Sequence, residues 1–367
     1  MSLSTPKPVD VLALAAEAFG GRGGIAQSTR DLMVAMSEHP ETNNIFILPR
    51  LQREAVTQLP VGIRQFPAVG SRLLYSLQAI RLALKLKPRI VYCGHAFMAP
   101  LALLVARLAG ARLLSHVHGL EVWEPLPPTK RHALASSDLI LCVSNFTAGK
   151  VVEVTGVNPK RCEVIYNTID DRFTPGDRAA ARAHFGLAQE AVVLSTVSRL
   201  DCGQRHKGHD RIIPLLAELS RDVPGLTYVI AGTGDDRDRL EGLAHDTGAA
   251  DLVRFLGFVP DADLPDLYRA SDLYVMPSHG EGFGIAFVEA MCCGTPALGL
   301  DIGGAGDALR DGELGRAVAK ADFAHALRDA VTAAPADHAD LAARTRATFG
   351  RSAFAERLAR ACGPLLP

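Results

Sequence analysis

The feature that most constrains this chain is a regular alternation, from one end to the other, of short β-rich apolar runs with segments of helical periodicity. Such runs are typical of strands that are buried on both faces in a parallel sheet covered by helices. In the first half they are DVLALAA, NIFILP, RIVYCGH, RLLSHVH, DLILCVS and CEVIYN. After a break at NTIDDRFTPGD, residues 167–177, they resume as AVVLSTVSRL, LTYVIAG, VRFLGFV, DLYVMP and TPALGLD.

This pattern predicts an α/β protein with two Rossmann-like domains, residues 1–172 and 173–350. The length of 367 residues suits two domains of ordinary size. Ligands of open parallel sheets bind outside the carboxyl ends of the strands. We therefore expect an inter-domain cleft that is lined by loops from both domains.

Charge and composition exclude some classes of protein. Residues 1–172 hold 19 Lys/Arg against 13 Asp/Glu, and the rest of the chain holds 20 against 27, although the whole chain is at −1. This balance argues against a nucleic-acid partner. The excess of positive charge in the first half is compatible with an anionic partner or an anionic membrane. Seven cysteines without a CxxC pair indicate a reducing compartment. With Asp10 and Glu17 in the first apolar run, and no apolar segment long enough to span a bilayer, we expect a cytoplasmic protein, peripheral to a membrane at most.

The first glycine-rich loop is FGGRGGIAQSTRDL, between a strand and a helix. Its backbone amides, at Gly21, Gly23 and Gly24 among others, can approach a phosphate or a sugar closely. GRGGIA also fits the dinucleotide pattern G-x-G-x-x-A, but the acidic residue expected about 20 positions later is missing. An NADP-dependent oxidoreductase, with Arg50 near the 2′-phosphate, is therefore an alternative.

The second loop, SRLDCGQRHKGHD, places Arg199, Arg205 and Lys207 after a buried strand. Cations at such a strand end can neutralise a diphosphate, and do so more strongly as it leaves.

The third loop lies in SHGEGFGIAFVEAMCCGTP and holds two acids eight positions apart, Glu281 and Glu289. Gly284 and the helix start at Ile285 offer amides and a positive dipole to a phosphate. An acid beside that site would repel phosphate and is better suited to accept hydrogen bonds from hydroxyls. The apolar neighbours of Glu289 predict that it is buried. Two acids around a phosphate site point to a nucleotide sugar.

The run E-G-F-G-I-x-x-x-E, the preceding R-x-x…K-G and the later GTP resemble the retaining family-4 glycosyltransferases with the two-Rossmann GT-B fold, over nearly the whole chain. The resemblance implies that Arg199 and Lys207 hold the donor diphosphate, that Glu281 binds hydroxyls of the transferred sugar, and that Glu289 holds the ribose. No metal and no cofactor are expected.

The same resemblance assigns the remaining donor contacts to the backbone. Amides of Phe283, Gly284 and Ile285 would line the phosphates. Phe258 and Val259 would contact the base, so GDP-mannose and UDP-hexose are not distinguished by side chains.

In the first half, Gly24 would lie near the leaving phosphate, Gly21 and Gly23 on the acceptor side, and His118 beside the transferred sugar. His116 shares a strand face with His118, which makes a metal pair an alternative, although no third ligand has a recognisable spacing. The family's chains also imply that residues 351–367 form a helix that crosses back to the first domain.

Two departures from the family pattern are present. Cys202, Gly203 and Gln204 lengthen the basic loop, which leaves Arg205 and Lys207 as competing phosphate cations. Asp307 stands where the family often has glutamate.

The expected activity is metal-independent transfer of a mannosyl or glucosyl group, with retention, to a glycan, a lipid-linked or a small-molecule acceptor, in cell-envelope or exopolysaccharide synthesis. The leaving diphosphate would deprotonate the acceptor. A non-catalytic two-lobed nucleotide or sugar binder is a further alternative. Residues 71–89 carry five cations and no acid, so they predict either a basic amphipathic helix at an anionic membrane or an ordinary crossover helix.

Overall fold

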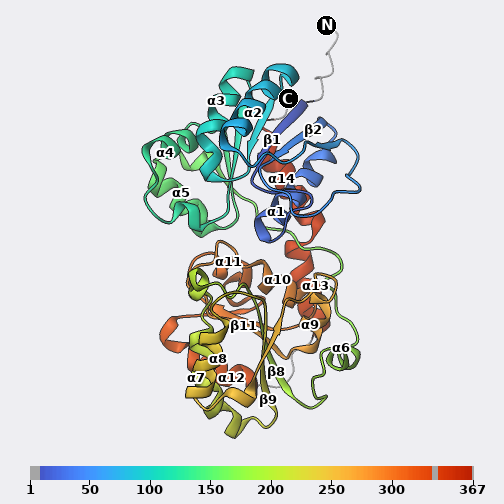
Figure 1. Ribbon diagram of the computed structural model, residues 1–367, viewed down its shortest axis with the longest axis vertical. Helices are drawn as coiled ribbons and strands as arrows, with labels where there is room; N and C mark the ends of the chain where they lie inside the picture. The colour runs from blue at the N-terminus through green and yellow to red at the C-terminus, as the bar shows by residue number, and fades with distance from the viewer. Residues whose placement is uncertain (1–8, 333–337, 366–367) are drawn as a thin grey trace. The chain divides into compact units, whose positions relative to one another are not determined.

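The computed structural model describes residues 9–332 and 338–365. It separates into two compact units (Figure 1). Unit 1 is Met1–Thr168 with Arg351–Pro367, and unit 2 is Ile169–Gly350. Each unit holds one parallel sheet with helices on both faces, so the predicted α/β class with two Rossmann-like domains is confirmed.

The sheet of unit 1 has seven parallel strands in the order β3-β2-β1-β4-β5-β6-β7. The strands are β1 (Val9–Ala15), β2 (Thr42–Pro49), β3 (Ile63–Gln65), β4 (Ile90–Cys93), β5 (Arg112–Val117), β6 (Leu139–Cys142) and β7 (Cys162–Val164). The chain moves outward from β1 to β3 and then returns to add β4 on the other side of β1. The loops after β1 and β4 therefore flank the point where the strand order reverses, which is the ligand position of such sheets.

The helices of unit 1 divide between the two faces of its sheet. They are α1 (Gly24–Ser37), α2 (Arg72–Leu86), α3 (Ala99–Ala109), α4 (Pro128–Ala135), α5 (Asn145–Thr155) and α14 (Arg351–Cys362). Alternate strand residues point to opposite faces: Leu12 faces α2 to α5, whereas Val11 faces α1 and α14.

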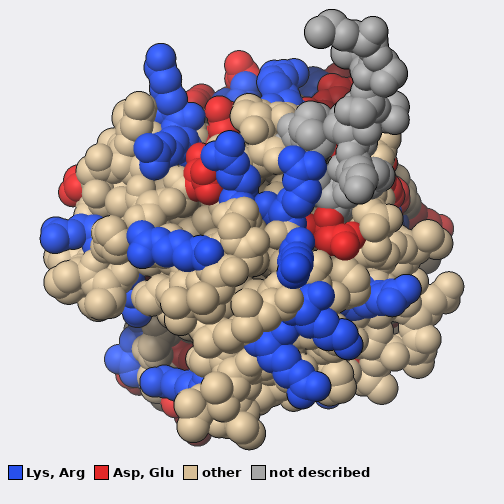
Figure 2. Space-filling model, turned by 90° about the horizontal axis from the view of Figure 1, so that it is seen from above, with Lys and Arg blue, Asp and Glu red and all other residues tan. Residues whose placement is uncertain are grey.

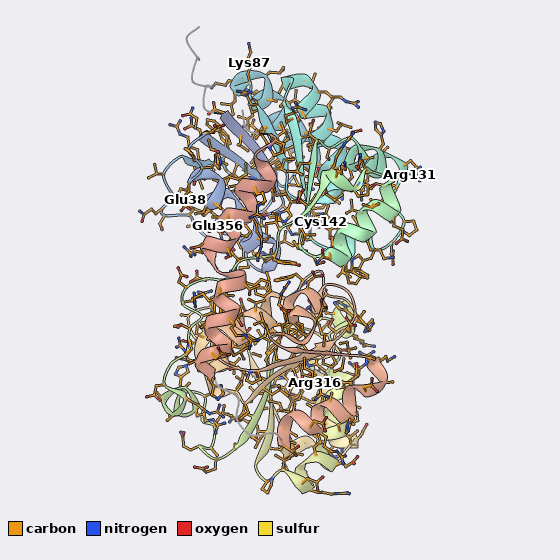
Figure 3. The ribbon with its side chains drawn as sticks, turned by 180° about the vertical axis from the view of Figure 1, so that it is seen from behind. Glu38, Lys87, Arg131, Cys142, Arg316 and Glu356 are labelled. Atoms are coloured by element: carbon orange, nitrogen blue, oxygen red, sulfur yellow. The ribbon has the colours of Figure 1, made fainter. Side chains whose placement is uncertain are left out.

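Helix α14 packs within unit 1, although it follows unit 2 in the sequence. Phe354 and Leu358 contribute to the same core cluster as Met33 of α1. Glu38, just after α1, and Glu356 of α14 line one shallow pocket and lie near each other (Figure 3). The predicted return of the chain to the first domain is therefore present, and the last two residues of the predicted range, 366–367, lie outside the described residues.

The sheet of unit 2 has six parallel strands in the order β10-β9-β8-β11-β12-β13. The strands are β8 (Val192–Val197), β9 (Leu226–Ala231), β10 (Val253–Gly257), β11 (Leu273–Met276), β12 (Ala297–Leu300) and β13 (Arg316–Val318). The order reverses between β8 and β11. The two charged loops singled out in the sequence, which follow these two strands, thus flank the reversal point.

The helices of unit 2 also cover both faces of its sheet. They are α6 (Arg178–His184), α7 (His209–Asp222), α8 (Arg237–Asp246), α9 (Leu264–Ala270), α10 (Ile285–Cys292), α11 (Ala305–Leu309), α12 (Phe323–Thr332) and α13 (His338–Phe349). Helices α7, α8 and α12 pack on one face, and α6 and α9 pack on the other. Among the helices described, in either unit, none is long and apolar enough to cross a membrane.

Candidate functional site

Two loops of unit 2 bring a cation and an acid together. Lys207 ends the loop after β8 and Glu281 lies in the loop after β11, and Lys207 Nζ is 2.6 Å from Glu281 Oε1. Their side chains are only 18 % and 9 % exposed. The His279 N–H donates to the His206 carbonyl at 3.0 Å, which joins the two loops beside the pair.

Gly208 explains the K-G dipeptide. Its φ is +88°, and a Cβ at this position would lie 2.4 Å from the Pro277 carbonyl oxygen. Only glycine allows the end of the first loop to approach the second this closely. This close approach of the two loops brings Lys207 next to Glu281.

Arg205 is engaged elsewhere. Its Nη2 lies 2.9 Å from Oδ1 of the nearly buried Asp236, which also pairs with Arg239 at 2.5 Å. The hydrogen bond from Arg239 is the main cause that lowers the pKa of Asp236, and the positive charges of Arg239 and Arg205 lower it further. The carboxylate is therefore ionised at neutral pH. Of the two competing cations, Lys207 is therefore the one that contacts Glu281, and Arg205 is held by Asp236.

Arg199 follows β8 and pairs with a residue of its own loop. Its side chain is 73 % exposed, and its ion-pair partner is Asp201 at 3.7 Å, a weak contact. The sequence therefore predicted the loop that holds Arg199, whereas its proposed phosphate contact stays a prediction.

Glu289 lies on α10 and is buried, as its apolar neighbours predicted. The Tyr268 hydroxyl donates to Glu289 Oε2 at 2.7 Å. Burial raises the pKa of Glu289 to about 7, against the opposing effect of this hydrogen bond. Sequence reasoning missed Tyr268, because nothing in the sequence pairs a tyrosine of α9 with an acid 21 positions away.

Helix α10 begins directly after Gly284, whose φ is +96°. A Cβ there would lie 2.6 Å from the Phe287 ring, so the turn into the helix requires glycine. Ile285 is the first helical residue, and Phe283 packs against Phe349 with ring centroids 5.5 Å apart. The amides of these residues lie at the positive end of the α10 dipole, where an anion is stabilised. The Gly304 N–H donates to the Glu281 carbonyl at 2.8 Å and ties the loop before α11, the helix of Asp307, to the Glu281 loop.

Phe258 and Val259 directly follow β10 at the carboxyl edge of the same sheet. Val259 is buried, whereas Phe258 is 61 % exposed. An exposed aromatic ring at a ligand-binding edge offers a stacking surface for a base. The sequence analysis predicted that the backbone of these two residues contacts the base, and it did not predict a contact from the Phe258 ring.

In unit 1, the glycine loop joins β1 to α1 and is fixed by a neighbouring loop. The N–H groups of Arg53 and Glu54 donate to the Gly20 carbonyl at 2.9 and 3.0 Å. Arg30 donates to the Gly21 carbonyl at 2.9 Å. Gly23, with φ +85°, precedes Gly24, the first residue of α1.

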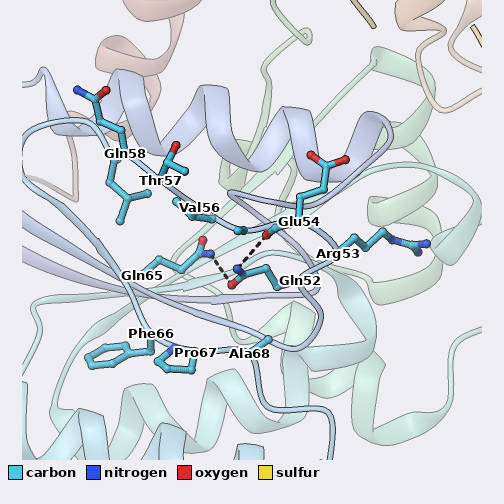
Figure 4. Close-up of a pocket in the computed structure, with 12 residues that line it drawn as sticks. Gln52, Arg53, Glu54, Val56, Thr57, Gln58, Gln65, Phe66, Pro67 and Ala68 are labelled. Atoms are coloured by element: carbon cyan, nitrogen blue, oxygen red, sulfur yellow. Dashed lines mark hydrogen bonds between the residues drawn. The ribbon is translucent and has the colours of Figure 1, made fainter. Parts of the chain in front are cut away.

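A pocket of about 640 Å³ adjoins this loop, lined by residues 52–59 and 65–68 (Figure 4). Gln65 Nε2 lies 3.4 Å from Gln52 Oε1, and the Gln52 side chain donates to the Glu54 carbonyl at 2.9 Å. Gln65 also exchanges hydrogen bonds with the backbone of Phe19 at 3.1 and 2.8 Å. The pocket wall and the glycine loop are thus one hydrogen-bonded structure, which sequence reasoning did not identify.

His118 follows β5 and is held at both its backbone and its ring. Its N–H donates to Glu121 Oε1 at 2.6 Å, and its Nε2 lies 3.0 Å from the Gly94 carbonyl. A carbonyl only accepts, so Nε2 carries the hydrogen and Nδ1 is an acceptor. Burial lowers the pKa of His118, which favours the neutral ring at pH 7.

His116 is a core residue of β5. It is 2 % exposed, its Nδ1 is 2.9 Å from the Tyr92 hydroxyl, and its ring centroid is 4.2 Å from that of His118. Among the described residues no group of three or more His, Cys, Asp or Glu side chains could hold a metal ion. Within the described ranges, the structure therefore shows no third ligand for a metal ion bound by His116 and His118.

Two family models match the chain. The one described as Glycosyl transferases group 1 matches residues 177–350, and the one described as Glycosyltransferase Family 4 matches residues 22–173. Together the two models cover most of the chain, which belongs to the glycosyltransferases that they describe. The match favours a glycosyltransferase over the NADP-dependent oxidoreductase that the GRGGIA run left open.

Curated relatives of this glycosyltransferase chain include two named D-inositol 3-phosphate glycosyltransferase. The protein from Geodermatophilus obscurus is 39% identical over 212 residues, 54% of this chain and 46% of the relative. The protein from Rhodococcus erythropolis is 38% identical over 226 residues, 59% of this chain and 50% of the relative. The match thus spans about half the length of these curated relatives.

Solved structures share the fold. HepE from Anabaena in complex with UDP aligns with a TM-score of 0.76 at 20% identity and covers 97% of this chain and 100% of that one. Sucrose-phosphate synthase from Thermosynechococcus elongatus aligns with a TM-score of 0.74 at 20% identity, covering 97% and 99%. The chain therefore has the GT-B fold that the sequence motifs implied.

Proposed function

We propose that this protein is a retaining, metal-independent glycosyltransferase that takes a mannosyl or glucosyl group from a nucleotide diphosphate sugar. The observation that carries the proposal is the Lys207–Glu281 ion pair at the carboxyl edge of the unit 2 sheet. It places the cation that a leaving diphosphate needs beside the acid that sugar hydroxyls need. The family membership of the chain supports the same activity.

In this proposal, the donor binds along the carboxyl edge of the unit 2 sheet. The ring of Phe258 stacks on the base, and Glu289, already an acceptor for Tyr268, accepts a hydrogen bond from the ribose. The amides of Phe283, Gly284 and Ile285 bind phosphate oxygens at the start of α10.

Lys207 exchanges its partner when the donor binds. Its ammonium moves from Glu281 to a phosphate oxygen, and Glu281 is released to accept hydrogen bonds from sugar hydroxyls. Arg199, which is exposed and only weakly paired, turns toward the same diphosphate. These cations stabilise the negative charge that develops as the bond from the sugar C1 to the phosphate oxygen breaks. The acceptor oxygen bonds to C1 on the same face, and its proton passes to the departing phosphate.

We assign the acceptor to unit 1. The pocket beside the glycine loop is lined by the amides of Gln52 and Gln65 and by Arg53, whose guanidinium pairs with Glu17 Oε1 at 3.2 Å. In this proposal these groups exchange their present partners for the oxygens of a hydroxylated, anionic small molecule. The name of the two curated relatives favours such a small phosphorylated polyol over a glycan. His118 assists the sugar transfer as a neutral ring. The cytoplasmic location and a role in cell-envelope or exopolysaccharide synthesis stay predictions.

A thermal-shift series with GDP, UDP, dTDP, ADP and NADPH, with Mg²⁺ and with EDTA, tests the proposal. We expect one nucleoside diphosphate to raise the unfolding temperature equally in both conditions. The matching nucleotide sugar should then give a product whose anomeric configuration, read by NMR, equals that of the donor. A shift with NADPH alone, a strict need for Mg²⁺, or an inverted product would overturn the respective part of the proposal. Binding without any turnover would favour the non-catalytic binder.

A further inference from the structure

Helix α2 has two apolar sides, only one of which is needed for the core. Tyr75, Ala79, Leu82 and Ala83 are buried against the sheet of unit 1. Four further leucines lie on the side away from the sheet: Leu73 (69 % exposed), Leu74 (59 %), Leu77 (55 %) and Leu84 (54 %). A helix on the surface of a globular protein ordinarily has polar residues at those positions.

Helix α3 continues the same feature. It packs beside α2 (Figure 1), and its Leu104 and Leu108, one turn apart, are each 47 % exposed. We call the outward side of the two helices the leucine face; it consists of Leu73, Leu74, Leu77, Leu84, Leu104 and Leu108. Single exposed leucines are common, but six on two adjacent helices form a patch of the kind that marks a binding surface.

The charged residues on the two helices of the leucine face are all basic. No Asp or Glu occurs from residue 55 to residue 120. The exposed cations of the two helices and their ends are Arg72, Arg81, Lys85, Lys87 and Arg107. Within the ranges that the structure describes, none of these five forms an ion pair with a carboxylate. Lys87 stands out at the end of α2 (Figure 3), and the face seen in Figure 2 shows basic side chains among uncharged residues with few acidic ones.

We propose that the leucine face and its cations dock unit 1 on the surface of an anionic lipid bilayer. Leucine side chains enter the boundary between headgroups and acyl chains, while Lys and Arg reach the lipid phosphates with their charged ends. A nucleic acid would attract the cations but would gain nothing from the leucines. A second copy that paired the same face with itself would bring its five cations against five more.

The docking is interfacial. Helix α2 has 15 residues and α3 has 11, and both cover the core with their opposite sides, so neither can leave the fold to span a bilayer. The proposal goes beyond the glycosyl transfer and does not depend on it.

Vesicle co-sedimentation tests the proposal with the full chain. We expect binding to vesicles of phosphatidylcholine with phosphatidylglycerol at low salt and far weaker binding to phosphatidylcholine alone. Arg81→Gln with Lys85→Gln should weaken the binding roughly 25-fold, since each cation near an anionic surface contributes about fivefold. Leu77→Gln with Leu84→Gln should weaken it similarly and leave the net charge unchanged.

Arg221→Gln with Arg360→Gln is the matched control, because both side chains are exposed and lie outside α2 and α3. This control should bind as the wild type does, and all variants should keep the wild-type far-UV circular dichroism and nucleotide binding. Absence of wild-type binding to the anionic vesicles at low salt overturns the proposal. So does an equal loss in the control, which would mean unspecific attraction, or a dimer in sedimentation velocity that the leucine variant dissociates.

Discussion

Lys207 and Glu281, which lie 74 positions apart in the sequence, form an ion pair of 2.6 Å at the carboxyl edge of the unit 2 sheet. Both side chains are largely removed from solvent. The proposed reaction requires this pair to open, because the lysine is needed by the diphosphate and the acid by the sugar. The pair is therefore the first place to test the proposed function.

Removing the cation should impair the chemical step. We expect Lys207→Ala to lower the turnover number about 10²- to 10³-fold, which is the usual effect of losing one preorganised charge-stabilising group. Arg205→Ala is the matched control, because this arginine is held by Asp236, and it should lose less than about tenfold. Steady-state kinetics with the nucleotide sugar identified by thermal shift provide the measurement. Wild-type turnover in Lys207→Ala, or equal losses in both variants, would contradict the assignment.

The same pair should matter for stability. Lys207→Met leaves the carboxylate of Glu281 buried without a partner, and we expect a loss of about 3 kcal/mol in the free energy of unfolding. The double variant Lys207→Met/Glu281→Leu should recover most of it, because no charge is then left unpaired. Urea denaturation followed by circular dichroism compares the variants. Additive losses in the double variant would show that the two residues do not interact.

Glu289 should make stability depend on pH. Its pKa is raised from 4.5 to about 7 in the folded protein, chiefly by burial. Between these two values the unfolded chain releases the proton while the folded chain keeps it, so the contribution is full below pH 4.5 and is lost as the pH rises through 7. Wild type should therefore lose about 3 kcal/mol relative to Glu289→Gln between pH 4 and pH 8. Urea denaturation of both proteins over this range is the measurement, and a difference that does not change with pH would refute the expectation.

Phe258 should contribute to nucleotide affinity and hardly to stability. Stacking of a base on an aromatic ring is worth about 1–3 kcal/mol, so Phe258→Ala should raise the dissociation constant for the nucleoside diphosphate by roughly 5- to 150-fold. Its ring is largely exposed, and the unfolding temperature without nucleotide should stay the same. Phe97→Ala, an exposed phenylalanine of unit 1, is the control and should bind as the wild type does. Calorimetric titration decides, and unchanged affinity in Phe258→Ala would mean that the base binds elsewhere.

His118 should act on turnover and not on nucleotide binding. We expect His118→Ala to lower turnover at least tenfold while the affinity for the nucleoside diphosphate, which we assign to unit 2, stays within about twofold. Burial lowers the pKa of His118, so its protonation falls on the acid side of pH 6.5, and wild-type turnover should show no loss from this residue as the pH rises from 7 to 8. Turnover and calorimetric affinity measured across this range are the test. A parallel loss of turnover and affinity would assign His118 to nucleotide binding instead.

The local pattern of the sequence predicted the long elements well. Buried parallel strands are apolar along their whole length, and this is visible without any tertiary contact, so β1, β8 and β11 and the loops that follow them could be located. The two missed strands, β3 (IRQ) and β13 (RAV), have three residues each and include arginine, so they show no apolar run. The equally short β7 was recognised because Ile165 and Tyr166 extend its apolar pattern. The segments β3 and β13 are strands because a neighbouring strand offers them hydrogen bonds.

By itself, the sequence determined the two-sheet architecture, the glycine positions in the loops and the burial of Glu289, because each of these depends on residue types that are close together in the chain. Only the tertiary structure decided which charges meet. It paired Lys207 with Glu281, assigned Arg205 to Asp236 and gave Glu289 the hydroxyl of Tyr268. These partners come from different loops and helices, and their distances depend on how strands and helices pack, which no local pattern records. The exposure of the leucines on α2 and α3 also follows only from the tertiary structure, because leucine occurs both in cores and on docking surfaces.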